Sequence, residues 1–452
     1  MPTAATQHTN ADRRHVVVVG LGRTGFSCAR FLAARGERVV VTDSRAEPPE
    51  LPALQALGAR IEARVGGFDV RVLEGARQVV VSPGVSLEEP FLERARSAGL
   101  EIVGDIELFA RAVEGPVVGV TGTNGKSTVT TLIAQMAQTA GRRVRAGGNL
   151  GEPALDLLAG EVGELYVLEL SSYQLETTSS LKLRAATILN ITPDHLDRYA
   201  SVDAYAAAKA RILDRCDVAV LNADDAAVMR LARSGQRTVT FSLDPARAAD
   251  YRALRKDGDV TLLRRGERLV AMSELRIAGL HNAANALAAL AVAEAIGLED
   301  RYALAALRAF PGLEHRTAWV ADLGGVRYID DSKGTNVGAT LAAVAGFEGP
   351  LIVIAGGDGK NQDFTPLARA FRGKVRHAVL IGRDAPAIER ALAGATATSR
   401  SATLEDAVRS AQAIAHPGDT VLLSPACASF DMFRDYHHRG AVFAAAVKGL
   451  SA

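Results

Sequence analysis

The chain has 452 residues, of which 48% are hydrophobic, and its 52 Lys and Arg residues against 51 Asp and Glu give a net charge of +1. At about 150 residues per domain this length predicts three domains, because a single core seldom grows beyond about 250–300 residues. The near-neutral charge argues against nucleic acid or an anionic membrane as the main partner, and no apolar run approaches the roughly 18–20 residues that span a bilayer.

The first residues and the cysteines favour an intracellular protein. Residues 1–15 are polar and lack the apolar stretch of a signal peptide, so we expect a tail there. Three cysteines, Cys28, Cys216 and Cys427, are too far apart in the sequence for a zinc motif and odd in number for a disulfide framework. This usage predicts a reducing, cytoplasmic environment.

Strand-like and helix-like segments alternate along most of the chain, which is typical of α/β proteins with parallel sheets. We place the first domain at residues 1–106. Its valine-rich runs are typical of strands that are buried on both faces. The elements expected here are strands at 15–19, 38–43, 78–82 and 101–104, with a helix at 26–35 after the first strand.

The second domain is predicted at residues 107–311 and the third at 312–452. In the second we expect strands at 116–122, 167–170 and 186–192, a small antiparallel insert at 238–275 and an Ala/Leu-rich helix at 281–296. In the third we expect strands at 328–330, 351–357, 377–382 and 420–424.

A glycine fingerprint opens the first domain. Gly20-Leu-Gly22-Arg-Thr-Gly25 follows a strand and starts a helix, and Asp43 ends the next strand. Such glycines let a phosphate approach backbone N–H groups at a helix start. The pattern therefore indicates either a binding site for the phosphate of a nucleotide-like ligand or simply a tight turn. An NAD-dependent oxidoreductase is one alternative, although nothing downstream resembles a hydride-transfer site.

A second glycine-rich loop is more specific. Residues 119–128 read GVTGTNGKST. In such a glycine-rich loop the backbone amides can cradle phosphates. Lys126 would reach the terminal phosphates and the Ser127 hydroxyl could bind Mg²⁺. Val120 stands where the strict phosphate-loop pattern has its first glycine. Taken alone, the loop would also fit a P-loop ATPase or a motor-like binding protein.

Polar residues follow two later strands of the second domain. Glu169 comes at the end of one, and Asp194 and His195 follow another. The carboxyl ends of strands in open α/β sheets bind ligands, and these side chains could bind Mg²⁺ that bridges ATP and a second substrate.

The lysines are few, and half of them lie in motifs. Only eight of the 52 basic residues are lysines. Arginine cannot replace a lysine that must act as a compact charge or lose its proton. The four that fall in motifs are Lys126, Lys209, Lys333 and Lys360. On its own, Lys209 would be interpreted as a solvated helical lysine.

Together these segments resemble the Mur ligases from about residue 15 to the C-terminus. The LSSYQLETTSSL and SPACASFD segments point to the member of the family that adds D-glutamate. The resemblance rests on GDIELF (104–109), GTNGKSTVTTL (122–132), GGN (147–149), ELSSYQLETTSSL (169–181), DHLDRY (194–199), HNAANAL (281–287), HR (315–316), DDSKGTN (330–336), GGDGK (356–360) and LSPACASFD (423–431).

The resemblance implies an α/β fold of three domains: a Rossmann-like N-terminal domain, a central P-loop ATPase-like domain with a parallel sheet, and a C-terminal Rossmann-like domain. It implies an ATP-dependent ligase that adds D-glutamate to UDP-N-acetylmuramoyl-L-alanine through an acyl phosphate, in peptidoglycan synthesis. A sibling ligase that uses another amino acid, L-glutamate included, is the alternative. The expected partners are these small molecules, with no nucleic acid and no membrane insertion, and we expect a monomer.

The resemblance also assigns roles to residues of this chain. The catalytic residues would be Lys126, His195 and Lys209. ATP would be bound by Gly122, Thr123, Asn124, Gly125, Lys126, Ser127, Thr128, Asn282, Asn285, Arg316 and Asp331. The UDP substrate would be bound by Arg23, Thr24, Asp43, Ser44, Arg45, Ser82, Gly84, Asn149 and Ser171. Glutamate would be bound by Lys333, Thr335, Lys360, Ser429 and Tyr436. Mg²⁺ would be held by Ser127, Glu169, His195 and Lys209, the last as a carbamate formed with CO₂.

Overall fold

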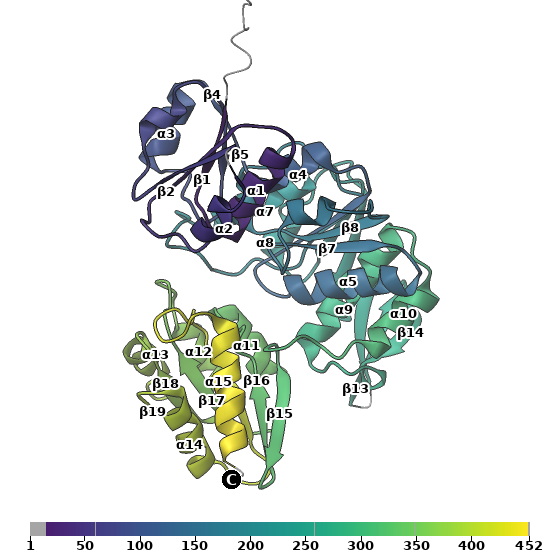
Figure 1. The fold of residues 1–452 in the computed structure, drawn as a ribbon. Coiled ribbons are helices and arrows are strands. Elements are labelled where there is room, and N and C mark those ends of the chain that lie inside the picture. Colours follow the sequence, from purple (N-terminus) through teal and green to yellow (C-terminus); the bar gives the residue numbers. More distant parts are fainter. Residues whose placement is uncertain (1–14, 59, 257, 348, 451–452) are drawn as a thin grey trace, which may run out of the picture. The chain divides into compact units, whose positions relative to one another are not determined.

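The computed structural model describes residues 15–58, 60–256, 258–347 and 349–450, and three separate sheets run through them (Figure 1). The predicted α/β class is confirmed, whereas the domain boundaries near residues 106 and 311 stay predictions. The predicted N-terminal tail lies outside the described residues. None of the described helices combines the length and the apolar character needed to cross a membrane.

The chain divides into two compact units, which are described separately below. Unit 1 contains the chain up to Thr121, Gly141–Thr187 and Ala207–Ala219, and unit 2 contains Gly122–Ala140, Ile188–Ala206 and the chain from Val220 onward.

The first sheet lies in unit 1 and has the strand order β3-β2-β1-β4-β5, with all neighbours parallel. Its inner strands are runs of valine that are almost fully buried, as expected for a parallel sheet covered on both faces. Helix α1 begins at Arg23, three residues before the predicted start. The strands are β1 (His15–Val19), β2 (Val39–Asp43), β3 (Ile61–Val65), β4 (Ala76–Val81) and β5 (Glu101–Val103), and the helices are α1 (Arg23–Ala34), α2 (Leu51–Gln55), α3 (Pro90–Ser97) and α4 (Asp105–Ala112), with a 3₁₀ turn at Val70–Leu73.

The second sheet has nine strands in the order β14-β13-β12-β11-β10-β9-β6-β8-β7. Its strands are β6 (Val117–Thr121), β7 (Val144–Gly148), β8 (Leu165–Glu169), β9 (Ala185–Ile188), β10 (Ala219–Asn222), β11 (Thr238–Ser242), β12 (Tyr251–Lys256), β13 (Asp259–Arg264) and β14 (Glu267–Ala271). Its helices are α5 (Lys126–Thr139), α6 (Ser172–Glu176), α7 (Val202–Ala210), α8 (Ala226–Met229), α9 (Leu280–Ala295) and α10 (Asp300–Ala309), with 3₁₀ turns at Ala154–Leu158, Arg211–Leu213 and Met272–Glu274.

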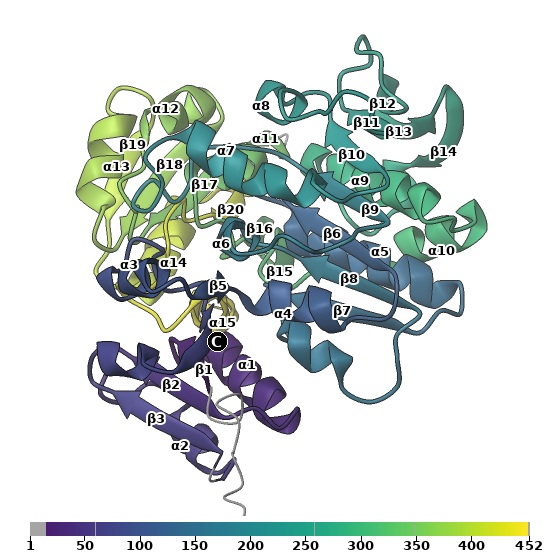
Figure 2. The same cartoon turned by 90° about the horizontal axis from the view of Figure 1, so that it is seen from above.

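The segment predicted as a small antiparallel insert corresponds to β11–β14. Strands β12, β13 and β14 are antiparallel to one another, as predicted, but β11 and β12 are parallel. The four strands do not form a sheet of their own; they continue the second sheet beyond β10 (Figure 2). The predicted Ala/Leu helix is α9, which packs against α5 and α10 through its buried alanines and leucines.

The third sheet lies in unit 2 and has the order β15-β16-β20-β17-β18-β19, in which only the β15–β16 pair is antiparallel. Helices α11, α12 and α13 cover one face, and α14 and α15 cover the other (Figure 1). Its strands are β15 (Ala318–Leu323), β16 (Val326–Asp330), β17 (Leu351–Gly356), β18 (Val375–Ile381), β19 (Ala397–Arg400) and β20 (Thr420–Leu423), and its helices are α11 (Val337–Ala345), α12 (Thr365–Phe371), α13 (Ala385–Leu392), α14 (Leu404–Ile414) and α15 (Tyr436–Gly449).

Three polar loops follow the carboxyl ends of parallel strands in this third sheet. Residues 331–336 follow β16, residues 357–363 follow β17 and residues 424–431 follow β20. Because these strands are neighbours in the sheet, the loops emerge at the same edge, where open α/β sheets bind ligands.

Candidate active site

The predicted phosphate loop joins the end of β6 to the start of α5. Gly122 and Gly125 both have left-handed backbone conformations, with φ of 148° and 83°. A Cβ atom on Gly125 would lie 2.4 Å from the Asn285 side-chain oxygen, so a larger residue would force the Asn285 side chain to move. The loop therefore needs glycine at this position to pass close to α9 and to turn its amides toward a ligand.

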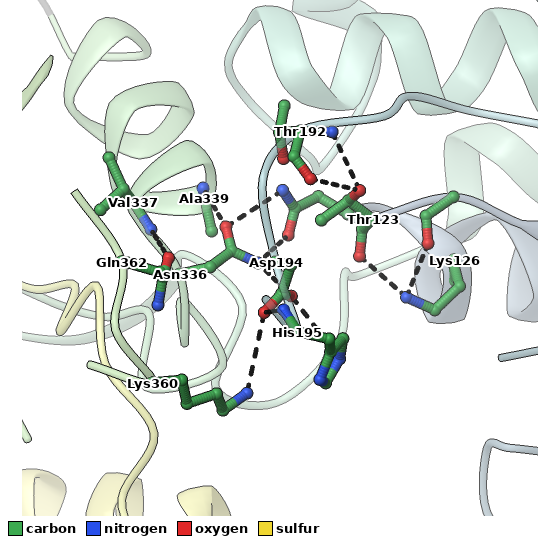
Figure 3. A network of polar contacts seen from close by, with 12 residues as sticks. Thr123, Lys126, Thr192, Asp194, His195, Asn336, Val337, Ala339, Lys360 and Gln362 are labelled. Atoms are coloured by element: carbon green, nitrogen blue, oxygen red, sulfur yellow. Dashed lines mark hydrogen bonds and ion pairs between the residues drawn. The ribbon is translucent and has the colours of Figure 1, made fainter. Parts of the chain in front are cut away.

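Cationic groups surround the start of α5. The Lys126 ammonium donates to the carbonyl oxygens of Gly122 at 3.0 Å and Thr123 at 2.8 Å (Figure 3). Arg316 donates to the Ser127 hydroxyl at 2.6 Å. Together with the partial positive charge of a 14-residue helix at its N-terminus, these groups make a site for an anion such as a polyphosphate.

A cavity of about 850 Å³ opens beside this loop within unit 2. That volume lies in the range of sites for nucleotide-sized ligands. Apolar walls come from Phe241, Ile277, Trp319 and Phe347. Seven of the eleven residues predicted to bind ATP line it, namely Asn124, Gly125, Thr128, Asn282, Asn285, Arg316 and Asp331. The other four, Gly122, Thr123, Lys126 and Ser127, belong to the same phosphate loop and the start of α5.

Two titratable groups in this cavity are shifted by burial. Burial raises the pKa of Asp331 to about 7, against the opposing effects of the Ser424 hydroxyl and the Arg316 charge. Burial also lowers the pKa of His281 to about 4, so this imidazole is neutral at physiological pH. Near neutrality Asp331 can thus donate or accept a hydrogen bond, which suits recognition of a hydroxyl-bearing ligand. Sequence reasoning did not single out His281, because its motif was read for the two asparagines.

A polar network next to the phosphate loop contains residues that the sequence analysis did not assign (Figure 3). The Asn124 backbone N–H donates to the Asn190 side chain at 2.8 Å, and Thr192 N–H donates to the Thr123 hydroxyl at 3.0 Å. The Asp194 carboxylate lies 3.8 Å from the Lys360 ammonium. Asn336 contacts both Asn124 and Asp194. Asn336 is the last residue of the DDSKGTN motif, and this position was the one sequence feature that could have pointed to it.

The residues predicted to bind glutamate all lie in unit 2. The Lys333 ammonium lies 3.9 Å from the centre of the Tyr436 ring, which is the first residue of α15. The Thr335 N–H donates to the Lys333 carbonyl at 2.8 Å, and Ser429 is buried in the loop after β20. Lys360 is paired with Asp194, as above. The structure thus provides two ammonium groups on two of the three polar loops, as recognition of a dicarboxylate would require.

The residues predicted to bind the UDP substrate lie in unit 1, around the first glycine turn. Asp43 accepts hydrogen bonds from Leu21 N–H at 2.6 Å and from the Arg45 guanidinium at 2.8 Å. Burial opposes ionisation of Asp43, but the hydrogen bonds from Arg45 and Leu21 outweigh it and lower the pKa of this carboxyl. The Ser82 hydroxyl donates to the Gly20 carbonyl at 2.8 Å. Asp43 and Ser82 therefore hold the turn in shape, and Arg45 is half exposed beside it.

Two further predicted residues of unit 1, Asn149 and Ser171, make polar contacts of their own. The Asn149 side chain donates to the buried Glu169 carboxylate at 2.6 Å. Ser171 caps α6 in a reciprocal arrangement with Gln174. Gln174 in turn donates to the Asp105 carboxylate at 2.8 Å, so the GDIELF segment supports the α6 turn. Sequence reasoning used GDIELF only as a family marker and assigned Asp105 no task.

Replacing Asp105 with Asn should make stability less dependent on pH. Burial raises the pKa of Asp105 to about 6 from 3.8, against hydrogen bonds from Gln174 and the backbone. A raised folded-state pKa favours the fold below pH 3.8, and this contribution is lost as pH rises through about 6. Between pH 4 and pH 8 we expect Asp105→Asn to gain about 3 kcal/mol in unfolding free energy relative to the parent, at about 1.4 kcal/mol per pKa unit.

Urea unfolding of both proteins at several pH values measures this difference. Asp203→Asn changes a side chain that is 90% exposed and serves as the matched control. A difference for Asp105→Asn that stays constant with pH, as for the control, would contradict the burial argument.

Lys209 is not the solvated helical lysine that its local sequence suggests. It lies on α7 with only 1% of its surface exposed. His195, by contrast, is partly exposed and has a left-handed backbone with φ of 56°. Within the described ranges, no group of three or more His, Cys, Asp or Glu side chains is placed to hold a metal ion.

Comparison with known proteins assigns the whole chain to one group. Three family models match it: the MurD-like N-terminal domain of Mur ligases at residues 14–104, the Mur ligase middle domain at 120–293 and the glutamate ligase domain of Mur ligases at 315–427. The UDP-N-acetylmuramoylalanine--D-glutamate ligase of Nitrosococcus oceani is 51% identical over 434 residues, which are 96% of each chain. The ligase of the same name from Methylococcus capsulatus is 48% identical over 451 residues, 100% of this chain and 98% of the relative.

A solved structure shares the fold. The pseudomurein peptide ligase type C of Methanothermus fervidus aligns with a TM-score of 0.64 at 19% identity, covering 97% of this chain and 100% of that one.

Proposed function

The chain belongs to the Mur ligase family, and from that premise we propose how its residues join D-glutamate to UDP-N-acetylmuramoyl-L-alanine with ATP as the phosphoryl donor. It is an ADP-forming ligase of peptidoglycan synthesis. The observation that carries the proposal is the cavity of unit 2, which gathers seven predicted ATP residues beside the phosphate loop. Lys333 also lines this cavity, so residues proposed to bind the nucleotide and a residue proposed to bind glutamate lie around the same cavity.

The first step transfers the γ-phosphoryl group of ATP. An oxygen of the alanine carboxylate attacks the γ-phosphorus, the bond to the β-phosphate oxygen breaks, and ADP leaves an acyl phosphate behind. Lys126, Arg316 and the loop amides neutralise the charge that the phosphoryl group carries through this in-line transfer. Asn282, Asn285 and Asp331 would hold the nucleoside in the cavity.

The second step forms the amide bond. The deprotonated amine of glutamate attacks the acyl carbon, the tetrahedral species collapses, and inorganic phosphate leaves. His195 or a nearby carboxylate would take the proton from the amine. Lys333, Thr335, Lys360, Ser429 and Tyr436 would orient the glutamate. Exclusion of water protects the acyl phosphate from hydrolysis until the amine arrives.

Mg²⁺ fits the donors that the chain offers. Glu169 provides a buried carboxylate and Ser127 a hydroxyl, and Mg²⁺ prefers oxygen ligands and binds largely through substrate phosphates. We propose that Ser127, Glu169, His195 and a carbamylated Lys209 would be the protein groups that hold it. When bound, the ion supplies charge neutralisation at the phosphates.

The first glycine turn is proposed to bind the uridine diphosphate of the substrate, through Arg23, Thr24, Ser44, Arg45 and Gly84 around the frame made by Asp43 and Ser82. Asn149 and Ser171 would contact the muramoyl portion. We also propose that the chain works as a monomer in the cytoplasm, where its three cysteines would stay reduced.

A substrate panel tests the function. The chain is incubated with ATP, Mg²⁺ and UDP-N-acetylmuramoyl-L-alanine, and ADP is measured with D-glutamate, L-glutamate, L-alanine, L-lysine or no amino acid. We expect sustained ADP release only with D-glutamate. Release with another amino acid would identify a sibling ligase, and equal release with ATP alone would identify an ATPase. An NAD-dependent oxidoreductase would instead reduce or oxidise a nicotinamide cofactor added to the same mixtures.

A further inference from the structure

The side chain of Asn336 lies at the junction of the phosphate loop and the Asp194–Lys360 pair (Figure 3). Only 3% of Asn336 is exposed. Its amide nitrogen donates to the Asn124 side-chain oxygen at 3.1 Å and to the Asp194 carboxylate at 3.1 Å. Its amide oxygen accepts from Ala339 N–H at 2.8 Å and from the Asn124 side chain at 3.3 Å. Both protons and both lone pairs of this amide are thus used.

The pattern fixes which way the amide points. If it were reversed, its oxygen would face the Asp194 carboxylate and its NH₂ group would face the Ala339 N–H, so two contacts would become repulsive. Aspartate could keep the cap of α11, because the cap needs only an acceptor, but it could not donate to Asp194. The network therefore requires asparagine for a reason separate from helix capping.

Asp194 links Asn336 to Lys360, because it contacts both side chains. One carboxylate oxygen of Asp194 accepts from Asn336 at 3.1 Å, and the other lies 3.8 Å from the Lys360 ammonium. Lys360 lies in the loop after β17 and has a left-handed backbone with φ of 50°. Gln362, two residues further on, accepts from Val337 N–H at 2.9 Å, which ties the same loop to the start of α11.

We infer that Asn336 is a positioning residue that sets Lys360 for glutamate by holding Asp194 in register with Asn124 of the phosphate loop. The inference rests on the proposed function, because it takes Lys360 as a glutamate-binding residue. Asn336 itself is not proposed to contact a substrate; it acts through Asp194 and Lys360. Its effect should appear in kcat/KM for D-glutamate and should depend on the presence of Lys360.

The test is a double-mutant cycle at saturating ATP and UDP-N-acetylmuramoyl-L-alanine. Asn336→Ser keeps a capping oxygen for α11 but is too short to reach Asp194 and Asn124. Lys360→Gln leaves a polar side chain that is one bond shorter and removes the charge. We expect Asn336→Ser to lower kcat/KM for D-glutamate about tenfold and to change the KM for ATP much less, whereas the double variant should lose little beyond Lys360→Gln alone. Losses that multiply would overturn the inference.

A second variant keeps the test independent of folding. Asn336→Asp retains the capping oxygen but places a second carboxylate against Asp194, so we expect a lower thermal midpoint that still lies above the assay temperature. The folded variant should lose at least as much kcat/KM for D-glutamate as Asn336→Ser. Asn361→Asp makes the same change in the exposed residue next to Lys360 and serves as the control. Activity of Asn336→Asp equal to that control would overturn the inference. The parent's own requirement for D-glutamate tests the proposed function separately.

Discussion

Replacing Lys126 with alanine is expected to lower kcat by about a hundredfold to a thousandfold, with the fold intact. Lys126 is the first residue of α5, and its ammonium lies within hydrogen-bond distance of two carbonyl oxygens of the phosphate loop. There it can turn from the loop oxygens to the phosphoryl group in transfer. Removing it leaves charge on that group without its nearest neutralising partner.

Arginine should not rescue this position. Two loop carbonyl oxygens accept from the Lys126 ammonium at 2.8 and 3.0 Å, a geometry that suits a compact charge better than a planar guanidinium. The measurements are kcat from ADP release and the thermal midpoint, with Lys182→Ala, at an exposed lysine, as the control. Near-normal turnover in Lys126→Arg would show that the role assigned to Lys126 is wrong.

Lys209→Ala is expected to be nearly inactive, with kcat lowered by about a hundredfold, and to regain part of its activity when formate or acetate is added. Burial of an ammonium is costly, so a lysine with 1% of its surface exposed calls for a specific compensation. In the proposed carbamate, the neutral amine attacks CO₂, a C–N bond forms and one proton is lost. The product is an anion that can bind Mg²⁺, and a small carboxylate can replace it.

Three measurements separate this from a structural role. The thermal midpoint reports folding, the activity with and without formate reports the missing carboxylate, and Lys209→Arg removes the reactive amine while retaining a cation. A folded Lys209→Ala protein that formate does not reactivate would refute the carbamate, and so would full activity without any additive.

The sequence predicted individual strands better than it predicted which strands pair with one another. Apolar runs and glycine turns located most of the strands, because burial on both faces leaves a clear apolar signal. Five strands were not predicted, namely β3, β7, β10, β15 and β19. The segment 238–275 was correctly predicted as strands, but its place at the edge of the second sheet depends on pairing between distant segments. Alternation along one segment carries no information about the neighbouring strand.

In the candidate site, too, local motifs could be predicted from the sequence, whereas burial and contacts between distant segments could not. Motifs located the phosphate loop and the asparagines of α9, whereas the burial of Lys209 was not predicted. Helix α7 is so rich in alanine around Lys209 that it has no distinct polar face, so its sequence does not show which side is covered. The contact of Asn336 with Asp194 joins residues 142 positions apart and becomes visible only in the folded chain.

The single tryptophan of the chain gives the nucleotide cavity an optical signal of its own. Trp319 is the only indole in 452 residues, lines the cavity of unit 2 and is 62% exposed. Intrinsic fluorescence excited at the tryptophan band therefore originates beside the ligand, without a label or a substitution. A nucleotide that displaces water from this ring shifts the emission to shorter wavelength, so affinities of inactive variants can be titrated even where no product forms.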